Sequence, residues 1–599
     1  MFQKTTMAAA IAISTSLLLV ACGGSNGDNN GAVVGSGTTT GALLTGASAP
    51  TPAAPIDAMQ LQAAGATGAC GVSVSHIDYT TKGAAGESTT ASAAVMVPTG
   101  TDASCTGKRP VVLYAHGTNA DQTYNMAAVT NPAGGNPAVA EATLVAAQFA
   151  ANGYVVIAPN YAGYDTSTLS YHPYVNYKQQ SQEMIDALKA GRTALPTVAA
   201  TIADSGKLFV TGYSEGGYVA MAALKAMDAA NIPVTAGAPM SGPYSLGAYG
   251  DAIFSGNTPL GATLFAPLLT TGYQKAYKNI YTAPSNAYMS PFADKVESIL
   301  ADPVFSASLI NPSNLPGLFQ SVPDPTGATT DQFDPVTLNA TTPSNVTKSK
   351  FSFGFSPTNY MISTNYRVDY LKDAAAHPDG AVPTLTASPL PTTTATNTLR
   401  KAFALNDLRG YIPSMPVLMC GGNQDPTVFF SVNTQLMAGI MGNVAAAGAP
   451  VAFAMLDIDA TDPATSTTPA GSPSAVGFSA SPALGANVTA AMSNVSSQLQ
   501  AAFGAKLTAT GTAAGNYFST HLPAAVSAGA AAAGQAAAQA EIDKGNPAGA
   551  AAAGQAAGIA YVTAAATAYG KQVAASQYHG GLVPPYCTAA AQQFFKQYL

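Results

Sequence analysis

A glycine-flanked serine constrains the fold of this chain more than any other feature of its sequence. Residues 212–217 read Gly-Tyr-Ser-Glu-Gly-Gly, directly after the apolar run 208–211 and directly before a helical pattern over 217–230. A sharp strand-to-helix turn needs small residues on either side of its central serine. Such a turn raises the Ser214 hydroxyl above the edge of a sheet and points the start of a helix at it. The segment predicts a reactive serine at a strand end; an unremarkable serine in a glycine-rich turn is the alternative.

Short apolar runs alternate with helical patterns on both sides of this turn, which is typical of βαβ units around a parallel sheet. The run 110–115 is continuously apolar, as expected of a strand that is buried on both faces. We predict strands over 72–80, 91–97, 110–115, 155–158, 208–211, 234–238, 416–419 and 451–456, and helices over 138–152, 179–195, 217–230, 430–447 and 588–599. The predicted fold class is α/β, a mostly parallel sheet flanked by helices.

Two long segments interrupt this alternation. Residues 246–410 contain Pro-rich connections and short helical patterns, whereas residues 461–577 are rich in Ala and Gly. Within the second segment, Ala-Gly-Ala-Ala-Ala-Ala-Gly-Gln-Ala-Ala begins at Ala528 and again at Ala548. Alanine favours helix while the recurring glycine weakens it. Two interpretations stay open: a loosely helical two-helix arm, with substrate contact as one function, or poorly ordered low-complexity sequence.

The N-terminus has the pattern of an export signal. Lys4 precedes an apolar stretch over 7–21 that ends in Leu-Val-Ala and is followed by Cys22. This ending resembles the lipobox of bacterial lipoproteins, which implies that Cys22 becomes the lipidated first residue of the mature chain. A plain secretory signal with an incidental Cys22 is the alternative. Residues 22–55, rich in Gly, Ser, Thr and Asn, predict a flexible tether. We expect the protein to be exported and lipid-anchored in the bacterial outer membrane or at the cell surface. Release into the medium is the alternative.

The number and distribution of charged residues limit the kinds of molecule that the protein is expected to bind. The chain has 23 Lys+Arg and 30 Asp+Glu, a net charge of −7, and only 9% of its 599 residues are charged. Scattered cations form no basic stripe, so nucleic acid is not an expected partner. Beyond the N-terminus, no segment of the sequence has the roughly 20 consecutive apolar residues of a spanning helix.

The acid partner of Ser214 is expected after a later strand, because this arrangement places serine, acid and histidine in that chain order. Asp425 lies in the glycine-rich segment that follows the predicted strand 416–419. It would hold the histidine tautomer and stabilise the imidazolium. Asp457 and Asp459, at the end of the next strand, are alternatives, and Asp425 could be a simple turn residue.

Only two histidines, His521 and His579, follow Asp425 in the chain. His521 lies inside the Ala/Gly-rich segment, where nothing would hold its ring rigidly. His579 lies in a predicted loop bounded by glycines, just before the final amphipathic helix. We therefore predict that His579 is the base. For the oxyanion of the intermediate, the candidate donors are the backbone N–H of Glu215 and backbone N–H groups near Thr118, which follows the strand 110–115.

Four cysteines remain besides Cys22, and an even set in an exported protein predicts two disulfides with three possible pairings. Cys420 lies shortly before the acid and Cys587 shortly after the base. Because Asp425 and His579 must touch, we predict the pair Cys420–Cys587, which leaves Cys70–Cys105. No two cysteines have metal-ligand spacing, so no zinc site is expected.

These motifs together resemble the secretory lipase-like carboxylesterases of the α/β-hydrolase superfamily. The resemblance covers roughly 70–245, 405–460 and 577–599, and it is carried by His-Gly-Thr at 116–118, Asn-Tyr-Ala-Gly-Tyr at 160–164, His-Pro-Tyr at 172–174, the serine turn, Asn-Asp-Leu-Arg at 406–409, the segment 421–428 and His579. It implies a Ser214–Asp425–His579 triad, acyl-enzyme chemistry on esters, no cofactor, and a cap formed by 246–410. The departure is the insertion 461–577, where members of the family usually have a short loop.

The predicted organisation and function follow from these assignments. We expect a signal peptide (1–21), a tether (22–55), a hydrolase core (56–245, 411–460 and 578–599), a cap (246–410) and the Ala/Gly-rich insertion (461–577). The expected function is a surface-anchored serine esterase or lipase without metal or cofactor, acting on an acyl ester. A serine peptidase, a polyester depolymerase on the same triad, and a catalytically inactive surface-binding lipoprotein are the alternatives.

Overall fold

The computed structural model describes most of the chain from residue 40 onward. The described residues are 40–44, 50–130, 135–311, 314–321, 332–333, 340–341, 354–381, 390–460 and 477–599. The predicted signal peptide, Cys22 and most of the predicted tether lie outside these ranges.

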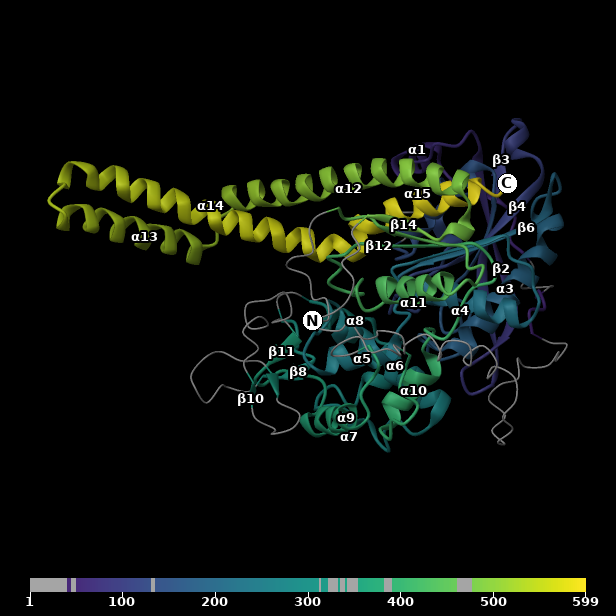
Figure 1. Ribbon diagram of the computed structural model, residues 1–599, viewed down its shortest axis with the longest axis horizontal. Helices are drawn as coiled ribbons and strands as arrows, with labels where there is room; N and C mark the ends of the chain where they lie inside the picture. The colour runs from purple at the N-terminus through teal and green to yellow at the C-terminus, as the bar shows by residue number, and fades with distance from the viewer. Residues whose placement is uncertain are drawn as a thin grey trace, which may run out of the picture.

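A ten-stranded sheet forms the centre of the protein (Figure 1), with strand order β1-β2-β3-β5-β4-β6-β7-β12-β13-β14. Neighbouring strands from β5 to β13 run parallel, while β1, β2 and β3 at one edge and β14 at the other pair antiparallel. The strands are β1 (Ala54–Pro55), β2 (Gly71–Lys82), β3 (Ser88–Thr99), β4 (Gly107–Ala115), β5 (Val155–Pro159), β6 (Ile202–Tyr213), β7 (Ala236–Met240), β12 (Val417–Gly421), β13 (Phe453–Asp457) and β14 (Phe478–Ala480).

Each predicted strand corresponds to a strand of this sheet, and the mostly parallel arrangement is confirmed. The central strands β5, β7, β12 and β13 are buried along their whole length, which explains their continuous apolar sequence. The edge strand β14 was not predicted. It spans three residues and is partly exposed, so its sequence has neither the length nor the apolar content of a typical strand.

Helices cover both faces of the sheet. The helix α15 (Val583–Lys596) packs on α2 (Val139–Gln148), and α3 (Tyr177–Val198) packs on α4 (Glu215–Ala229). In Figure 1, α15 lies on one side of the sheet, while α3, α4 and α11 (Thr434–Ala446) lie on the other. These are the five helices that the sequence predicts, and each lies within a few residues of its predicted range.

The predicted cap forms a helical layer beside the helices α4 and α11 (Figure 1). It contains α5 (Leu246–Phe254), α6 (Ala262–Tyr277), α7 (Pro284–Ala287), α8 (Pro303–Ser308), α9 (Thr364–Ala376) and α10 (Thr398–Asn406), with the short strands β8 (Phe319–Gln320), β9 (Gln332–Phe333), β10 (Ala340–Thr341) and β11 (Phe355–Ser356).

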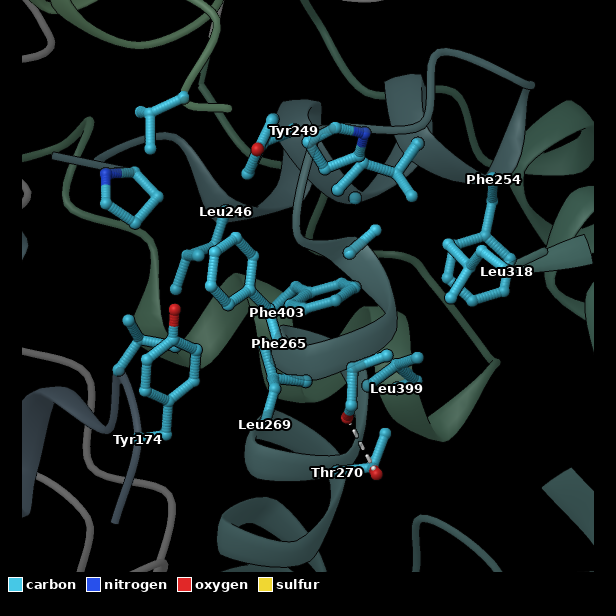
Figure 2. Close-up of a pocket in the computed structure, with 18 of the residues that line it drawn as sticks. Tyr174, Leu246, Tyr249, Phe254, Phe265, Leu269, Thr270, Leu318, Leu399 and Phe403 are labelled. Carbon is cyan, nitrogen blue, oxygen red and sulfur yellow. Dashed lines mark hydrogen bonds between the residues drawn. The ribbon is translucent and has the colours of Figure 1, made fainter. Parts of the chain in front are cut away.

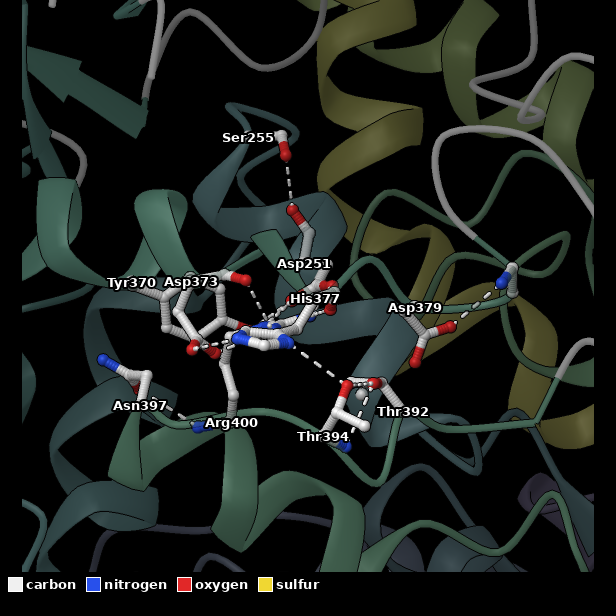
Figure 3. Close-up of polar contacts among 12 residues, drawn as sticks. Asp251, Ser255, Tyr370, Asp373, His377, Asp379, Thr392, Thr394, Asn397 and Arg400 are labelled. Carbon is white, nitrogen blue, oxygen red and sulfur yellow. Dashed lines mark hydrogen bonds and ion pairs between the residues drawn. The ribbon is translucent and has the colours of Figure 1, made fainter. Parts of the chain in front are cut away.

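A buried ion-pair cluster ties the cap helices together (Figure 3). Nη2 of Arg400 lies 2.7 Å from Oδ2 of Asp251, and its Nη1 lies 2.8 Å from Oδ2 of Asp373. The Tyr370 hydroxyl donates to the second oxygen of Asp251 at 2.8 Å. Since Arg400 comes from α10, Asp251 from α5 and Asp373 from α9, one guanidinium fixes three helices of the cap.

Residues 486–577 of the Ala/Gly-rich insertion form a long helical arm that projects from the body (Figure 1). It consists of α12 (Ala486–Thr520), α13 (Ala524–Asp543) and α14 (Ala550–Gln577). Glycines permit close helix contact: a Cβ on Gly570 of α14 would lie 2.3 Å from the carbonyl oxygen of Gly511 on α12. Over residues 486–577 the helical interpretation is confirmed, with three helices in place of two. Within the described residues, no helix has the length and apolar character needed to cross a membrane.

Candidate active site

The serine turn has the strained geometry that its sequence predicts. Ser214 lies between β6 and α4 with φ 60° and ψ −123°, in the left-handed half of conformational space. The flanking glycines are required by space, because a Cβ on Gly216 would lie 1.9 Å from the carbonyl oxygen of Ala115. A Cβ on Gly212 would lie 2.3 Å from the carbonyl oxygen of Gly216 itself. Backbone packing therefore fixes Ser214 at the carboxyl end of the sheet.

Three side chains far apart in the sequence meet at this turn. The Ser214 Oγ lies 2.7 Å from Nε2 of His579, and Nδ1 of His579 lies 2.6 Å from Oδ2 of Asp425. All three residues are buried, with Ser214 and His579 retaining 9% and 8% exposure. This order of contacts lets the imidazole accept the serine proton at one nitrogen while the carboxylate holds the proton on the other.

The acid is positioned by its own loop, which follows β12. Oδ1 of Asp425 accepts the backbone N–H groups of Thr427 at 2.8 Å and Val428 at 3.0 Å. These two donors occupy one carboxylate oxygen and leave the other to face His579. Of the carboxylates considered from the sequence, Asp425 is the one that contacts the histidine.

His579 lies in a π-helical turn, Tyr578–Leu582, that joins α14 directly to α15. The sequence predicted a loop here because of Gly580 and Gly581, and this prediction is wrong. Neither glycine adopts positive φ, so the backbone stays helical through both of them. The Tyr213 hydroxyl donates to the carbonyl oxygen of His579 at 2.7 Å and fixes the turn against the serine strand.

The other predicted candidates have supporting or unrelated positions. Oδ1 of Asp457 accepts the backbone N–H of Asn423 at 3.0 Å, and Oδ2 of Asp459 accepts the Tyr578 hydroxyl at 2.7 Å. Burial raises the pKa of Asp457 to about 8. The side chains of Asp457 and Asp459 therefore brace the acid loop and the residue before His579. His521 is exposed at the end of α12, where its ring stacks on Tyr517.

Both predicted disulfides are present, Cys70–Cys105 and Cys420–Cys587. Cys420 belongs to β12, which leads into the acid loop, and Cys587 belongs to α15, which follows the histidine turn. The second disulfide thus joins the two segments that carry Asp425 and His579.

The two predicted oxyanion donors differ in their surroundings. Glu215 is the first residue of α4, so its N–H belongs to the group at a helix start that has no partner within the helix. The N–H of Gly117 donates to Oε1 of Glu141 at 2.9 Å and is therefore engaged elsewhere. Thr118 contacts Tyr174 through its hydroxyl at 3.0 Å, and the role of its N–H stays a prediction.

A buried pair behind the serine was missed by the sequence reasoning. Oε1 of Glu215 lies 2.5 Å from Nε2 of His172 and accepts the Gln180 side-chain N–H at 2.7 Å. Burial alone would lower the pKa of His172, but the charge and hydrogen bond of Glu215 raise it. The pair anchors the side chain of Glu215, the residue that follows Ser214 in the chain. The motif residues at 172–174 were noted in the sequence, but their spacing gave no sign of this contact.

The chain is similar to solved structures of the rice cell wall degrading esterase LipA from Xanthomonas oryzae. It is 24% identical to a ligand-bound form, with a TM-score of 0.51, over 72% of this chain and 94% of that chain. A second LipA structure is 25% identical, with a TM-score of 0.50, over 72% and 94%. The chain has the α/β-hydrolase fold. The prolyl oligopeptidase family matches residues 141–239, which include Ser214 but not Asp425 or His579. Among curated proteins, none matches this sequence.

An apolar pocket lies between the α/β-hydrolase core and the cap (Figure 2), and Ser214 is one of the residues that line it. Its volume, open mouth included, is about 890 Å³. Ser214 and Glu215 line the pocket, and its walls are formed chiefly by aliphatic and aromatic side chains of the cap, among them Leu246, Phe254, Phe265, Leu269, Leu399 and Phe403. The pocket can therefore take an apolar group attached to the atom that Ser214 attacks. In the described parts of the chain, no cluster of three His, Cys, Asp or Glu side chains could hold a metal ion.

Proposed function

We propose that this protein is a serine carboxylic-ester hydrolase of the esterase or lipase type. The observation that carries the proposal is the hydrogen-bonded series Ser214–His579–Asp425, whose serine lines an apolar pocket. An activated serine supplies acyl-transfer chemistry, and the apolar walls favour an uncharged hydrocarbon acyl group. The likeness to LipA structures, named as esterases, supports the same reaction class.

Each residue of the series has a role in the proposed mechanism. His579 accepts the Ser214 proton as Oγ attacks the ester carbonyl carbon, and Asp425 stabilises the imidazolium that forms. The N–H of Glu215, with a donor near Thr118, faces the oxyanion. His579 then returns the proton to the leaving alcohol oxygen, and the C–O bond breaks. A water molecule attacks the acyl-enzyme in the same way, which releases the acid and restores Ser214.

A serine peptidase is the second candidate, favoured by the match of residues 141–239 to the prolyl oligopeptidase family. The two functions share the nucleophile and differ in the substrate that reaches it. The pocket favours the ester hydrolase, since its walls offer few polar groups to a peptide backbone.

A substrate panel tests the proposal. Purified mature protein should hydrolyse p-nitrophenyl esters, with rates that depend on acyl chain length, and should leave dipeptide p-nitroanilides intact. Ser214→Ala should lose the ester activity while keeping the wild-type unfolding transition. Faster turnover of the anilides than of every ester would favour the peptidase instead.

We also propose that the protein is exported and lipid-anchored through Cys22. The lipobox-like sequence supports this location, and two disulfides are typical of proteins outside the cytosol. In a bacterial host, the wild-type chain should fractionate with membranes and dissolve in detergent, whereas Cys22→Ser should lose the lipid. Equal detergent partition of both forms would contradict the anchor.

A further inference from the structure

The segment 172–174 connects the two residues that carry the candidate oxyanion donors. It lies between β5 and α3. At its first residue, Nε2 of His172 lies 2.5 Å from Oε1 of Glu215. At its last residue, the Tyr174 hydroxyl lies 3.0 Å from Oγ1 of Thr118. This short segment therefore contacts both the start of α4 and the chain that follows β4.

The strand pairing of the sheet ends before it reaches either donor. The register of β4 with β6 ends at Ala115 and Gly212. Thr118 and Glu215 each lie three residues further along the chain (118 − 115; 215 − 212). An oxyanion needs both donors about 2.7–3.1 Å from one point. The separation of the two donors consequently depends on contacts beyond the strand ends, and the side chains of the segment 172–174 provide such contacts.

The His172 ring is held in an orientation that supports Glu215. Nδ1 of His172 lies 3.1 Å from the carbonyl oxygen of Ala162, and its Nε2 faces the Glu215 carboxylate. An imidazolium has an N–H at each nitrogen and can donate to both of these acceptors. The ring also stacks on Tyr161, with the ring centroids 5.5 Å apart. Neither side chain of the His172–Glu215 pair has exposed surface, so salt screens this ion pair little.

Tyr174 supports Thr118 from the side of the apolar pocket. The Tyr174 ring lines the pocket, while its hydroxyl contacts the Thr118 hydroxyl. The N–H of Gly117, one residue earlier, donates to Glu141, so the two neighbouring residues are held by different side chains. Removing the Tyr174 hydroxyl would release the Thr118 side chain and leave the aromatic ring in the pocket wall.

We propose that His172 and Tyr174 are positioning residues that hold the two oxyanion donors at a fixed separation. His172 acts through the Glu215 side chain, and Tyr174 acts through the Thr118 hydroxyl. The inference rests on the proposed ester hydrolase function and adds two residues to its machinery. Loss of one oxyanion donor costs roughly 10²–10³-fold in kcat, so displacement of a donor should cost at least about tenfold.

A double-mutant cycle on Tyr174 and Thr118 tests the proposal, with hydrolysis of p-nitrophenyl butyrate as the assay. Tyr174→Phe and Thr118→Val each remove one hydroxyl of the contact and keep the approximate shape of the side chain. Each should lower kcat at least about tenfold and leave KM within about twofold of the wild-type value. The double variant should lose no more than the larger of the two single losses, because both substitutions break the same contact.

Tyr171→Phe is the matched control. Tyr171 precedes His172 in the chain, but its hydroxyl donates to Oε1 of Glu87 at 2.6 Å, on the β2–β3 hairpin. The substitution makes the same chemical change in the same connection between β5 and α3. It should keep the wild-type kcat and KM.

A second cycle applies to His172 and Glu215. His172→Gln and Glu215→Gln each remove one charge of the pair and keep a side chain that can form hydrogen bonds. Each should lower kcat at least about tenfold, and the double variant should lose no more than the larger single loss. Urea unfolding of every variant checks that it folds. Where a charge variant does not fold, the cycle on Tyr174 and Thr118, which removes no charge, decides alone.

The outcomes distinguish this inference from the proposed function. Losses of kcat that multiply in a double variant would show that the paired residues act independently, and would overturn the inference. Wild-type kcat in Tyr174→Phe, a raised KM at wild-type kcat, or an equal loss in Tyr171→Phe would overturn it as well. Absence of Ser214-dependent turnover by the wild-type enzyme would instead overturn the ester hydrolase itself.

Discussion

Replacing Asp425 by asparagine separates the orienting role of this carboxylate from its place in the fold. In the wild-type site, Oδ1 accepts two backbone N–H groups, from Thr427 and Val428, and Oδ2 accepts the proton on Nδ1 of His579. An asparagine side chain must turn its oxygen toward the two backbone donors, because its NH₂ group cannot accept from them. The NH₂ group then faces His579.

The expected loss follows from this orientation. An NH₂ group opposite Nδ1 forces the imidazole to carry its proton on Nε2, and that tautomer cannot accept the proton of Ser214. Loss of the productive tautomer lowers kcat by roughly 10⁴, which is about 5.4 kcal/mol of transition-state stabilisation. The backbone donors keep their acceptor, so the free energy of unfolding should stay near the wild-type value.

The assay is hydrolysis of p-nitrophenyl butyrate at neutral pH, with urea unfolding on the same preparations. Asp425→Asn should lower kcat and leave KM nearly unchanged. Asp425→Ala is the contrasting variant: it should lose activity and also stability, because two buried N–H groups would lose their acceptor, at roughly 1–3 kcal/mol each.

Asp457→Asn is the matched control for the identity of the acid. Burial raises the pKa of Asp457 to about 8, so the wild-type group is largely protonated at neutral pH and an amide resembles it. Its activity should stay within a few-fold of wild type. An Asp425→Asn enzyme with more than a tenth of the wild-type kcat would refute the assignment of Asp425 as the acid partner of His579. A loss of kcat of about 10⁴-fold in Asp457→Asn would identify Asp457 as the acid instead.

Three further predictions concern stability. Removing the second disulfide with Cys420→Ser and Cys587→Ser together should lower the free energy of unfolding, measured by urea denaturation, by roughly 2–5 kcal/mol. A change below about 1 kcal/mol would mean that the bond hardly restricts the unfolded chain. Arg400→Met should cost roughly 3–5 kcal/mol, because Asp251 and Asp373 would remain buried without their cation; an unchanged midpoint of unfolding would contradict this role. The pKa of Asp457 is raised from 3.8 to about 8 in the folded state, so the folded protein binds more protons than the unfolded chain across that range, and this group makes stability fall as pH rises. Between pH 5 and pH 8, the urea midpoint of Asp457→Asn should therefore fall less than that of the wild type. An equal fall of the midpoint in both proteins would exclude a contribution from Asp457.

The sequence predicted the core of the site because short segments determine it. The Gly-x-Ser-x-Gly turn is fixed by local space, as the close contacts of Gly212 and Gly216 with backbone oxygens show. Chain order then limited the base to two histidines and placed Asp425 after a strand. The cysteine pairing followed from the required contact between Asp425 and His579, and both disulfides agree.

What the sequence did not predict depends on contacts between distant segments. The His172–Glu215 pair joins residues 43 positions apart, and no local pattern marks it. The Gly580–Gly581 pair favours a loop in isolation, yet α14 and α15 hold this segment in a continuous helical path. The arm was ambiguous because alanine and glycine have opposite helix propensities. In the folded protein, α12 and α14 approach each other closely at Gly511 and Gly570, and this packing between distant segments favours the helical conformation.

Labelling by a fluorophosphonate probe tests the central claim most directly, because the probe reacts only with an activated serine. We predict that wild-type protein incorporates one probe per chain, at Ser214 by peptide mass spectrometry, and that Asp425→Asn and His579→Ala label far more slowly. No labelling of folded wild-type protein, or labelling of a different serine, would contradict the account.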